Sequence, residues 1–165
     1  MLAEFIDICE RKGYVKPTVY QGIYNLLDRR HEGPVLEIVR KHGMEFVAHS
    51  PQASGFLAGS LTSGHVEGTR CAQGNIMSTD ARRYDTERHH EAIRFLDNAL
   101  KPHGIPKTEA SLRWLAFHSK LGPHDAIIFG SSKTEQIRQN VAAVEKGPLT
   151  DELVTVLDGI WATLQ

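Results

Sequence analysis

The chain has 165 residues, of which 41% are hydrophobic and 24% charged, and its formal net charge at pH 7 is -1. This composition indicates a globular protein with one core. It contains neither a basic block that would favour nucleic acid nor an apolar run long enough to span a bilayer. Cys9 and Cys71 lack paired spacing, so we expect neither a disulfide framework nor a metal site. Because the N-terminus has no signal-peptide pattern, we expect a cytoplasmic protein without nucleic acid or membrane partners.

The first third of the chain alternates helix and strand. Apolar residues with helical spacing over 2–9 predict an amphipathic helix that ends at Gly13, and a strand over 17–21 follows. Pro34 predicts the first position of a second helix, and 44–50 is apolar enough to form a buried strand.

A long segment over 51–86 then shows no sustained period and is rich in glycine, serine, threonine and charge. We expect it to be a long loop over the cofactor and substrate, because loops of this length in compact domains are more often functional than idle.

The second half of the chain returns to regular patterns. Helical spacing predicts one helix over 92–101 and a second one after Pro106. A third strand is predicted over 126–129, and two further helices are predicted over 134–146 and after Pro148. Alternating strands and helices predict an α/β fold with a parallel sheet and right-handed crossovers. Because three strands cannot close a barrel, we expect a narrow open sheet with two exposed edges.

The junction between the third strand and its helix is a candidate phosphate site. Ser132 and Glu135 have the spacing of a capping box, and the helix dipole would place its positive end beside Lys133. First-turn N–H groups at such a place suit a phosphate. The alternative is a serine-capped helix that binds nothing.

Two other features have plainer interpretations. His89 and His90 are adjacent, so they point to different faces of a helix and are expected on a solvated surface rather than around a metal ion. Trp114 and Trp161 lie in helical patterns and are expected in the core or in an interface.

Four blocks, at 17–25, 48–59, 110–114 and 128–140, together resemble the aldo-keto reductase family. The similarity is strongest to the branch that contains aflatoxin aldehyde reductases and fungal aryl-alcohol dehydrogenase-like enzymes. The resemblance implies a partial (β/α)₈ TIM barrel, in which the three strands correspond to strands six to eight. Residues 1–165 are therefore expected to be the C-terminal half only of such an enzyme.

The resemblance also implies a binding site for NADP. Gln21 would contact the nicotinamide carboxamide, and His49 would lie under the nicotinamide ring, where relatives usually have tyrosine. The resemblance places the pyrophosphate at Ser50, Gln52 and 54–57, the adenosine 2′-phosphate at 130–136, and the adenine at Gln139 and Asn140. The expected cofactor-binding residues are Gln21, His49, Ser50, Gln52, Gly55, Leu57, Gly130, Ser131, Ser132, Lys133, Gln136, Gln139 and Asn140. Weaker candidates for substrate contact are Arg70, Arg82 and Tyr84, although an exposed charged loop would look the same.

The implied activity is NADP-dependent reduction of an aldehyde or ketone, in fungal secondary metabolism. The family draws its catalytic aspartate, tyrosine, lysine and histidine from strands one to four, and this chain resembles only the later strands. We therefore assign no catalytic residue and expect the chain to be inactive unless a complementary half is supplied. The alternative is a non-catalytic remnant, or a subunit that binds a full-length reductase in a homo- or heterodimer.

Overall fold

A parallel three-stranded sheet lies at the centre of the fold. The computed structural model describes residues 1–69, 71–72, 74, 78–131 and 133–165. The strands are β1 (Val19–Ile23), β2 (Glu45–His49) and β3 (Ala126–Ile127), in the order β1-β2-β3. Both pairs are parallel. The prediction of an α/β fold with a narrow open parallel sheet is therefore confirmed.

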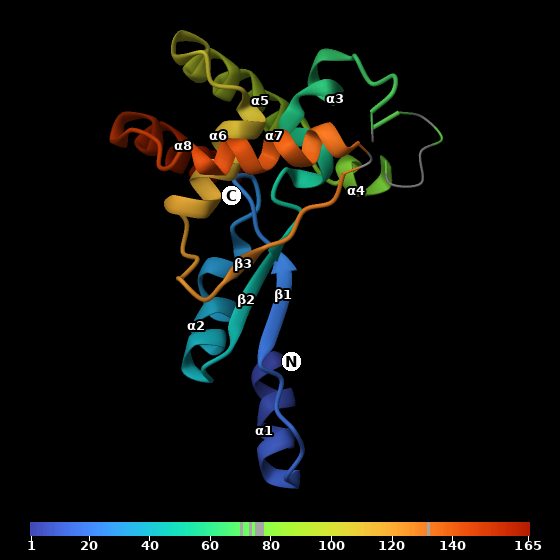
Figure 1. The fold of residues 1–165 in the computed structure, drawn as a ribbon. Helices are drawn as coiled ribbons and strands as arrows, with labels where there is room; N and C mark the ends of the chain where they lie inside the picture. Colours follow the sequence, from blue (N-terminus) through green and yellow to red (C-terminus); the bar gives the residue numbers. More distant parts are fainter. Residues whose placement is uncertain (70, 73, 75–77, 132) are drawn as a thin grey trace.

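The helices connect and flank these strands. Figure 1 shows α5 to α8 gathered beyond the carboxyl ends of the strands, and α1 at the opposite end of the sheet. The α-helices are α1 (Leu2–Lys12), α2 (Pro34–Lys41), α3 (Ser60–Ser63), α4 (Ser78–Arg82), α5 (Glu87–Leu100), α6 (Lys107–Phe117), α7 (Thr134–Glu145) and α8 (Asp151–Leu164). Three short 3-10 helices are η1 (Arg30–Glu32), η2 (Ala53–Ala58) and η3 (Lys101–His103). In the described part of the chain, none of these helices is both long and apolar enough to cross a membrane.

Helix ends follow the sequence signals closely. Gly13 ends α1 in the left-handed conformation, with a φ of 63°, and the Tyr14 N–H donates to the Cys9 carbonyl at 2.8 Å. Pro34 occupies the first turn of α2, as predicted. Thr86 caps α5, because its side chain accepts a hydrogen bond from the His89 N–H.

One face of the sheet packs into the core. Phe46 and Ala48 on β2 are fully buried, and Tyr24 packs edge-on against both Phe46 and Trp114. Trp114 is also fully buried, and its indole N–H donates to Asp158 at 3.0 Å, which joins α6 to α8. The prediction of a core position for Trp114 is confirmed, whereas Trp161 is only half-buried.

A buried carboxylate connects β2, α2 and the segment that leads into β3. The Asp125 side chain is only 1% exposed; it accepts from the Phe46 N–H at 2.7 Å and the Gly122 N–H at 2.6 Å, and it pairs with Arg40. Burial alone would raise the pKa of Asp125, but Arg40 and the two N–H donors outweigh it, so the pKa is lowered. This carboxylate fixes where the third strand enters the sheet.

The segment 51–86 differs from its prediction as a loop without regular structure, because it contains η2, α3 and α4. These elements are too short to show a hydrophobic period. Left-handed glycines such as Gly59 and Gly64 separate them, with φ values of 83° and 78°.

The histidine pair also differs in part from its prediction. The His90 side chain is 17% exposed; its Nδ1 lies 2.9 Å from the Thr62 hydroxyl and its Nε2 lies 2.9 Å from Asp85. The ring packs against Phe56, with centroids 5.3 Å apart. The expectation of a solvated surface is therefore wrong for His90, which joins α5 to the segment carrying α3.

Candidate functional site

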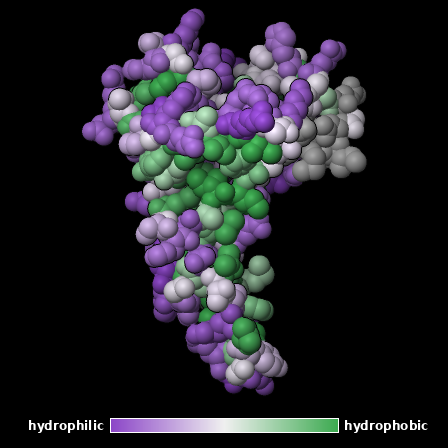
Figure 2. Space-filling view, viewed as in Figure 1, coloured by the Kyte–Doolittle hydropathy of each residue, from purple (hydrophilic) through white to green (hydrophobic). Residues whose placement is uncertain are grey.

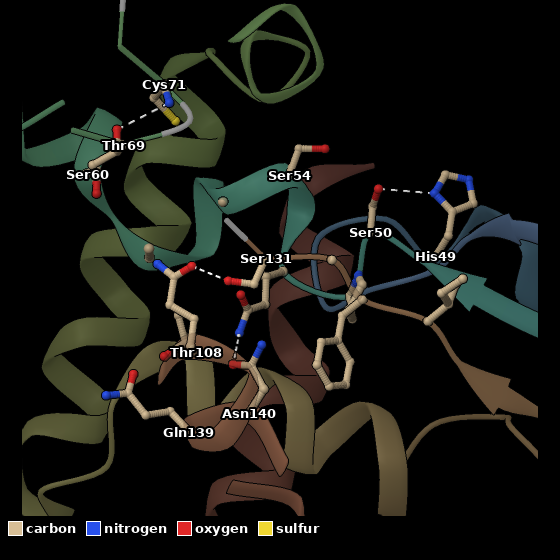
Figure 3. A pocket seen from close by; sticks show the side chains of 18 of the residues that line it. His49, Ser50, Ser54, Ser60, Thr69, Cys71, Thr108, Ser131, Gln139 and Asn140 are labelled. Carbon is tan, nitrogen blue, oxygen red and sulfur yellow. Dashed lines mark hydrogen bonds between the residues drawn. The ribbon is translucent and has the colours of Figure 1, made fainter. Parts of the chain in front are cut away.

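A cleft of about 620 Å³ opens where the carboxyl ends of the strands meet the start of α7. Gln21 from β1 and His49 from β2 line one part of it, and the segments after β2 and β3 line the rest. In parallel α/β folds, ligands bind at this end of the strands, because the loops that follow the strands converge there. Figure 3 shows His49 and Ser50 toward one end of the cleft, and Gln139 and Asn140 toward the other.

The loop after β2 has an unusual backbone. Ser50, Ala53 and Ser54 have φ values of 54°, 49° and 56°, and Gly55 follows with 94°. Residues other than glycine seldom adopt this region, which costs of the order of 1 kcal/mol or more at each position. Such strain persists only where the surrounding structure fixes it, and it is concentrated at ligand sites. Turns of this kind also direct backbone N–H groups toward a common point that suits an anion.

Asn25 fixes this loop from behind. Its side chain is fully buried, and its amide nitrogen donates to the Ser50 carbonyl at 3.0 Å and to the Tyr84 hydroxyl at 3.3 Å. Its amide oxygen accepts from the Leu27 N–H at 2.9 Å. Burial raises the pKa of Tyr84, which is 3% exposed and does not line the cleft. Tyr84 therefore supports the loop instead of facing a substrate in this cleft.

The two walls of the cleft contact each other directly. The Gln52 side-chain amide donates to the Asn140 amide oxygen at 3.1 Å, across 88 positions of sequence. This bond, drawn dashed in Figure 3, joins the loop after β2 to α7. On the strand side, His49 Nδ1 lies 3.1 Å from the Ser50 hydroxyl.

Ser131 organises the start of α7. Its hydroxyl lies 3.0 Å from the Lys133 carbonyl and 3.2 Å from the Lys133 N–H, and it also hydrogen-bonds the Gln136 side chain. Lys133 is the N-cap residue of α7 and is exposed, but it does not line the cleft. The predicted capping box involves Ser132, which lies outside the described residues.

Ten of the thirteen predicted cofactor residues line this one cleft; they are Gln21, His49, Ser50, Gln52, Gly55, Gly130, Ser131, Gln136, Gln139 and Asn140. Leu57 does not, because its side chain is completely buried in the core. Arg82 is exposed beside Asp85, 3.6 Å away, and Arg70 lies outside the described residues.

Ser54, which the family resemblance places in the loop around the pyrophosphate, also lines the cleft. Sequence reasoning did not assign the other lining residues, which are Pro51, Ala58, Ser60, Gly68, Thr69, Cys71, Thr108, Ile128 and Phe129. Ala58 stands beside an assigned position in the same block, so proximity in sequence could have found it. Thr108 is brought in by the packing of α6, and no local pattern marks it.

The chemistry of the cleft suits binding and orientation. Its described lining residues are mainly amides, hydroxyls, glycines and apolar groups, with one imidazole and one thiol. Its volume falls within the range of small-molecule and cofactor sites. Amides and hydroxyls can recognise a carboxamide or a base edge, while backbone N–H groups near a helix start suit phosphates.

Comparison with known proteins agrees with this arrangement. Residues 2–162 match the model of the Aldo/keto reductase family. The chain is 38% identical to mouse aflatoxin B1 aldehyde reductase member 2, with 97% of this chain and 46% of that protein covered. It is 37% identical to human aldo-keto reductase family 7 member A3 (97% and 51% covered) and 32% identical to an aldo-keto reductase of Pseudocercospora fijiensis (99% and 57% covered).

The chain thus spans about half the length of the relatives it matches. The match of the family model runs through all three strands and through both walls of the cleft. This chain belongs to the aldo/keto reductase family.

Proposed function

We propose that the cleft binds NADP(H) and that this chain supplies the nucleotide-binding wall of a carbonyl reductase. The proposal rests on one observation. The family resemblance assigns residues from separate sequence blocks to the cofactor, and ten of these residues line a single cleft. Helix and strand periodicity alone would not bring Gln21, Gln52 and Asn140 together. Their convergence supports a shared ligand.

The residue types change along the cleft in the same order as the parts of the dinucleotide, from the nicotinamide through the phosphates to the adenine. Gln21 and His49 lie at the strand end of the cleft, where an amide and an imidazole suit the nicotinamide carboxamide and ring. The strained loop and the start of α7 suit the phosphates, and Gln139 with Asn140 suits the adenine. When bound, the cofactor supplies a hydride to the carbonyl carbon.

Lys133 favours the phosphorylated form of the cofactor. It stands exposed at the N-cap of α7, where its ammonium adds to the positive end of the helix dipole. Lys133 lies outside the lining of the cleft, next to Ser131, which lines it. A 2′-phosphate near this place would gain a charge–charge attraction that a neutral ribose hydroxyl would not.

The reduction also needs a proton donor beside the carbonyl oxygen. The amides and hydroxyls that dominate the cleft bind and orient groups but donate protons poorly, and the imidazole of His49 is assigned to the nicotinamide ring. We therefore propose that the chain alone holds the cofactor weakly and does not turn over. In the complete reductase the substrates would be aldehydes or ketones, and the name of the mouse relative supports aldehydes.

The test is a titration of the purified chain with NADPH and NADH, followed by nicotinamide fluorescence. We expect NADPH to bind more tightly than NADH, with a dissociation constant above about 10 μM, which corresponds to less than roughly 7 kcal/mol. Gly130→Val should abolish binding without loss of fold, since Gly130 lines the cleft and an added Cβ meets no described atom within 4 Å.

Gly159→Val is the matched control, because an added Cβ there also meets open space, on α8 and away from the cleft. Equal loss in both variants, or no NADPH binding by the parent chain, would overturn the proposed site. If the chain alone consumed NADPH steadily with an aromatic aldehyde, the proposal that it does not turn over by itself would be wrong.

A further inference from the structure

A chain of side-chain hydrogen bonds runs from α3 to the turn before α5. His90 Nδ1 lies 2.9 Å from the Thr62 hydroxyl, and His90 Nε2 lies 2.9 Å from an Asp85 carboxylate oxygen. Because a carboxylate can only accept, Nε2 carries a hydrogen, and a neutral imidazole then accepts from the Thr62 hydroxyl at Nδ1. The three side chains form one connected unit, which we call the Thr62 relay.

Packing fixes the imidazole at the centre of the Thr62 relay. The His90 side chain is 17% exposed, and its ring centroid lies 5.3 Å from that of Phe56, which is fully buried in η2. The Phe56 centroid also lies 5.8 Å from that of Tyr84. A ring held by such packing is already oriented, so it can position the groups that its two nitrogen atoms contact.

Apolar contacts alone hold α3 weakly. The helix contains four residues, buries none of them fully, and is flanked by Gly59 and Gly64 in the left-handed conformation. Leu61 packs in part against the core. Figure 2 shows hydrophilic residues prevailing over the end of the molecule where α3 and α5 lie, whereas an apolar band follows the strands. Because so little apolar surface is buried here, the position of α3 depends on the Thr62 relay.

The position of α3 matters because this helix belongs to the cleft wall. Ser60, the first residue of α3, lines the cleft, and so does Thr69 further along the same segment. Where the wall begins, the Asn25 amide donates to both the Ser50 carbonyl and the Tyr84 hydroxyl. Tyr84 directly precedes the carboxylate of the Thr62 relay, so one turn holds the wall after β2 at two separate points.

We propose that His90 and Asp85 are positioning residues for nucleotide binding, which act through Thr62 to fix Ser60 and the wall that follows it. None of the three relay residues is among the described residues that line the cleft, so they would not contact the nucleotide themselves. The inference rests on the proposed function, since the ligand of this wall is the NADP(H) proposed above. A wall that is fixed before the nucleotide arrives loses less conformational entropy on binding.

Three substitutions separate the hydrogen bonds of the Thr62 relay from its packing. Thr62→Val removes the hydroxyl but keeps a branched side chain of similar size, whereas Thr62→Ser keeps the hydroxyl. His90→Phe removes both nitrogen atoms but keeps an aromatic ring beside Phe56. Thr155→Val is the matched control, because the Thr155 hydroxyl donates to the Asp151 carbonyl on α8, away from the cleft.

The first measurement needs no nucleotide. Amide hydrogen exchange of the full chain is followed by NMR at Ser63 and Gly64, whose N–H groups donate to backbone carbonyls in and before α3. We expect exchange at these amides to be about fivefold faster in Thr62→Val and in His90→Phe, because each variant lacks a hydrogen bond that holds α3. Thr62→Ser and Thr155→Val should keep the parental rates, and so should α6 and α8 in every variant.

The second measurement is the NADPH affinity of the same proteins, followed by nicotinamide fluorescence. Thr62→Val and His90→Phe should each raise the dissociation constant about fivefold, whereas Thr62→Ser should stay within about twofold of the parent. The double variant of Thr62→Val and His90→Phe should lose no more than the larger single loss, because both changes break the same relay.

Parental exchange at α3 in Thr62→Val and His90→Phe would overturn the inference, as would equal effects from Thr155→Val or additive losses in the double variant. Faster exchange with unchanged NADPH affinity would overturn it as well. A parent chain that does not bind NADPH would contradict the proposed function instead. The exchange rates would still decide the role of the Thr62 relay, since faster exchange supports it and parental exchange overturns it.

Discussion

At the scale of single residues, Asn25 shows why part of the site is invisible in the sequence. Its own position looks like an ordinary loop residue, yet it holds the Ser50 carbonyl, the Leu27 N–H and the Tyr84 hydroxyl at once. The last of these partners is 59 positions away. No local pattern encodes a contact of that range.

Asn25→Ala should lower the free energy of unfolding by about 2–4 kcal/mol, because it leaves buried polar groups without partners. Urea unfolding followed by circular dichroism measures the change. Asn25→Asp keeps the acceptor for the Leu27 N–H but removes the donor, so it should fall between the parent and the alanine variant. A loss below about 0.5 kcal/mol for Asn25→Ala would show that the loop does not depend on this residue.

Asp125 predicts a particular acid dependence. Its folded pKa is lowered below the ordinary value of 3.8, so its ionised form stabilises the fold above that pH. The contribution is lost as pH falls from 3.8 through the lower folded pKa. The free energy of unfolding should therefore decrease with acidification more steeply in the parent than in Asp125→Asn. If the free energy of unfolding fell equally steeply in the parent and in Asp125→Asn over pH 2–5, the lowered folded pKa of Asp125 would be contradicted.

At the scale of elements, glycine and proline signals located the helix boundaries well. Gly13 and Pro34 mark the end of α1 and the start of α2 as expected, because each acts through its own backbone. The segment 51–86 was harder, since η2, α3 and α4 are only six, four and five residues long and are held by tertiary contacts. The start of α7 depends on Ser131, one position before the serine that the capping pattern favoured.

Two glycine-to-alanine changes should act in opposite directions. Gly13→Ala places a side chain at a φ of 63° and should cost about 1 kcal/mol, although the space around it is open. Gly159→Ala lies inside α8, also in open space, and should gain about 0.5–1 kcal/mol. Thermal unfolding of both variants tests this. The same sign for both would show that backbone conformation does not control the difference.

At the scale of the whole molecule, the strand count and the resemblance carried most of the prediction. Three helix-flanked strands predicted the narrow parallel sheet, and the motif blocks identified residues on both walls of the cleft. Leu57 shows where this reasoning fails, because its side chain turns into the core while Gly55 and Ala58 line the cleft. A motif gives the position of a residue along the chain, and only packing decides which way its side chain points.

The open sheet explains another difference between pattern and structure. The helical spacing of α7 is that of a packed helix, yet Ala143 is its one buried residue among those described. Ile137 and Val141 have the right period but no neighbour in the described structure to cover them. The helical period of α7 therefore indicates a packing partner that the described sheet and helices do not supply.

The most direct measurement of the central claim is an amide-resolved NMR titration of the full chain with NADP⁺ up to millimolar concentration. We expect chemical-shift changes at Gln21, at His49 to Gly55 and at Gly130 to Asn140, with weak affinity. Spectra that remain unchanged at these positions, or changes confined to surfaces outside the cleft, would contradict the account.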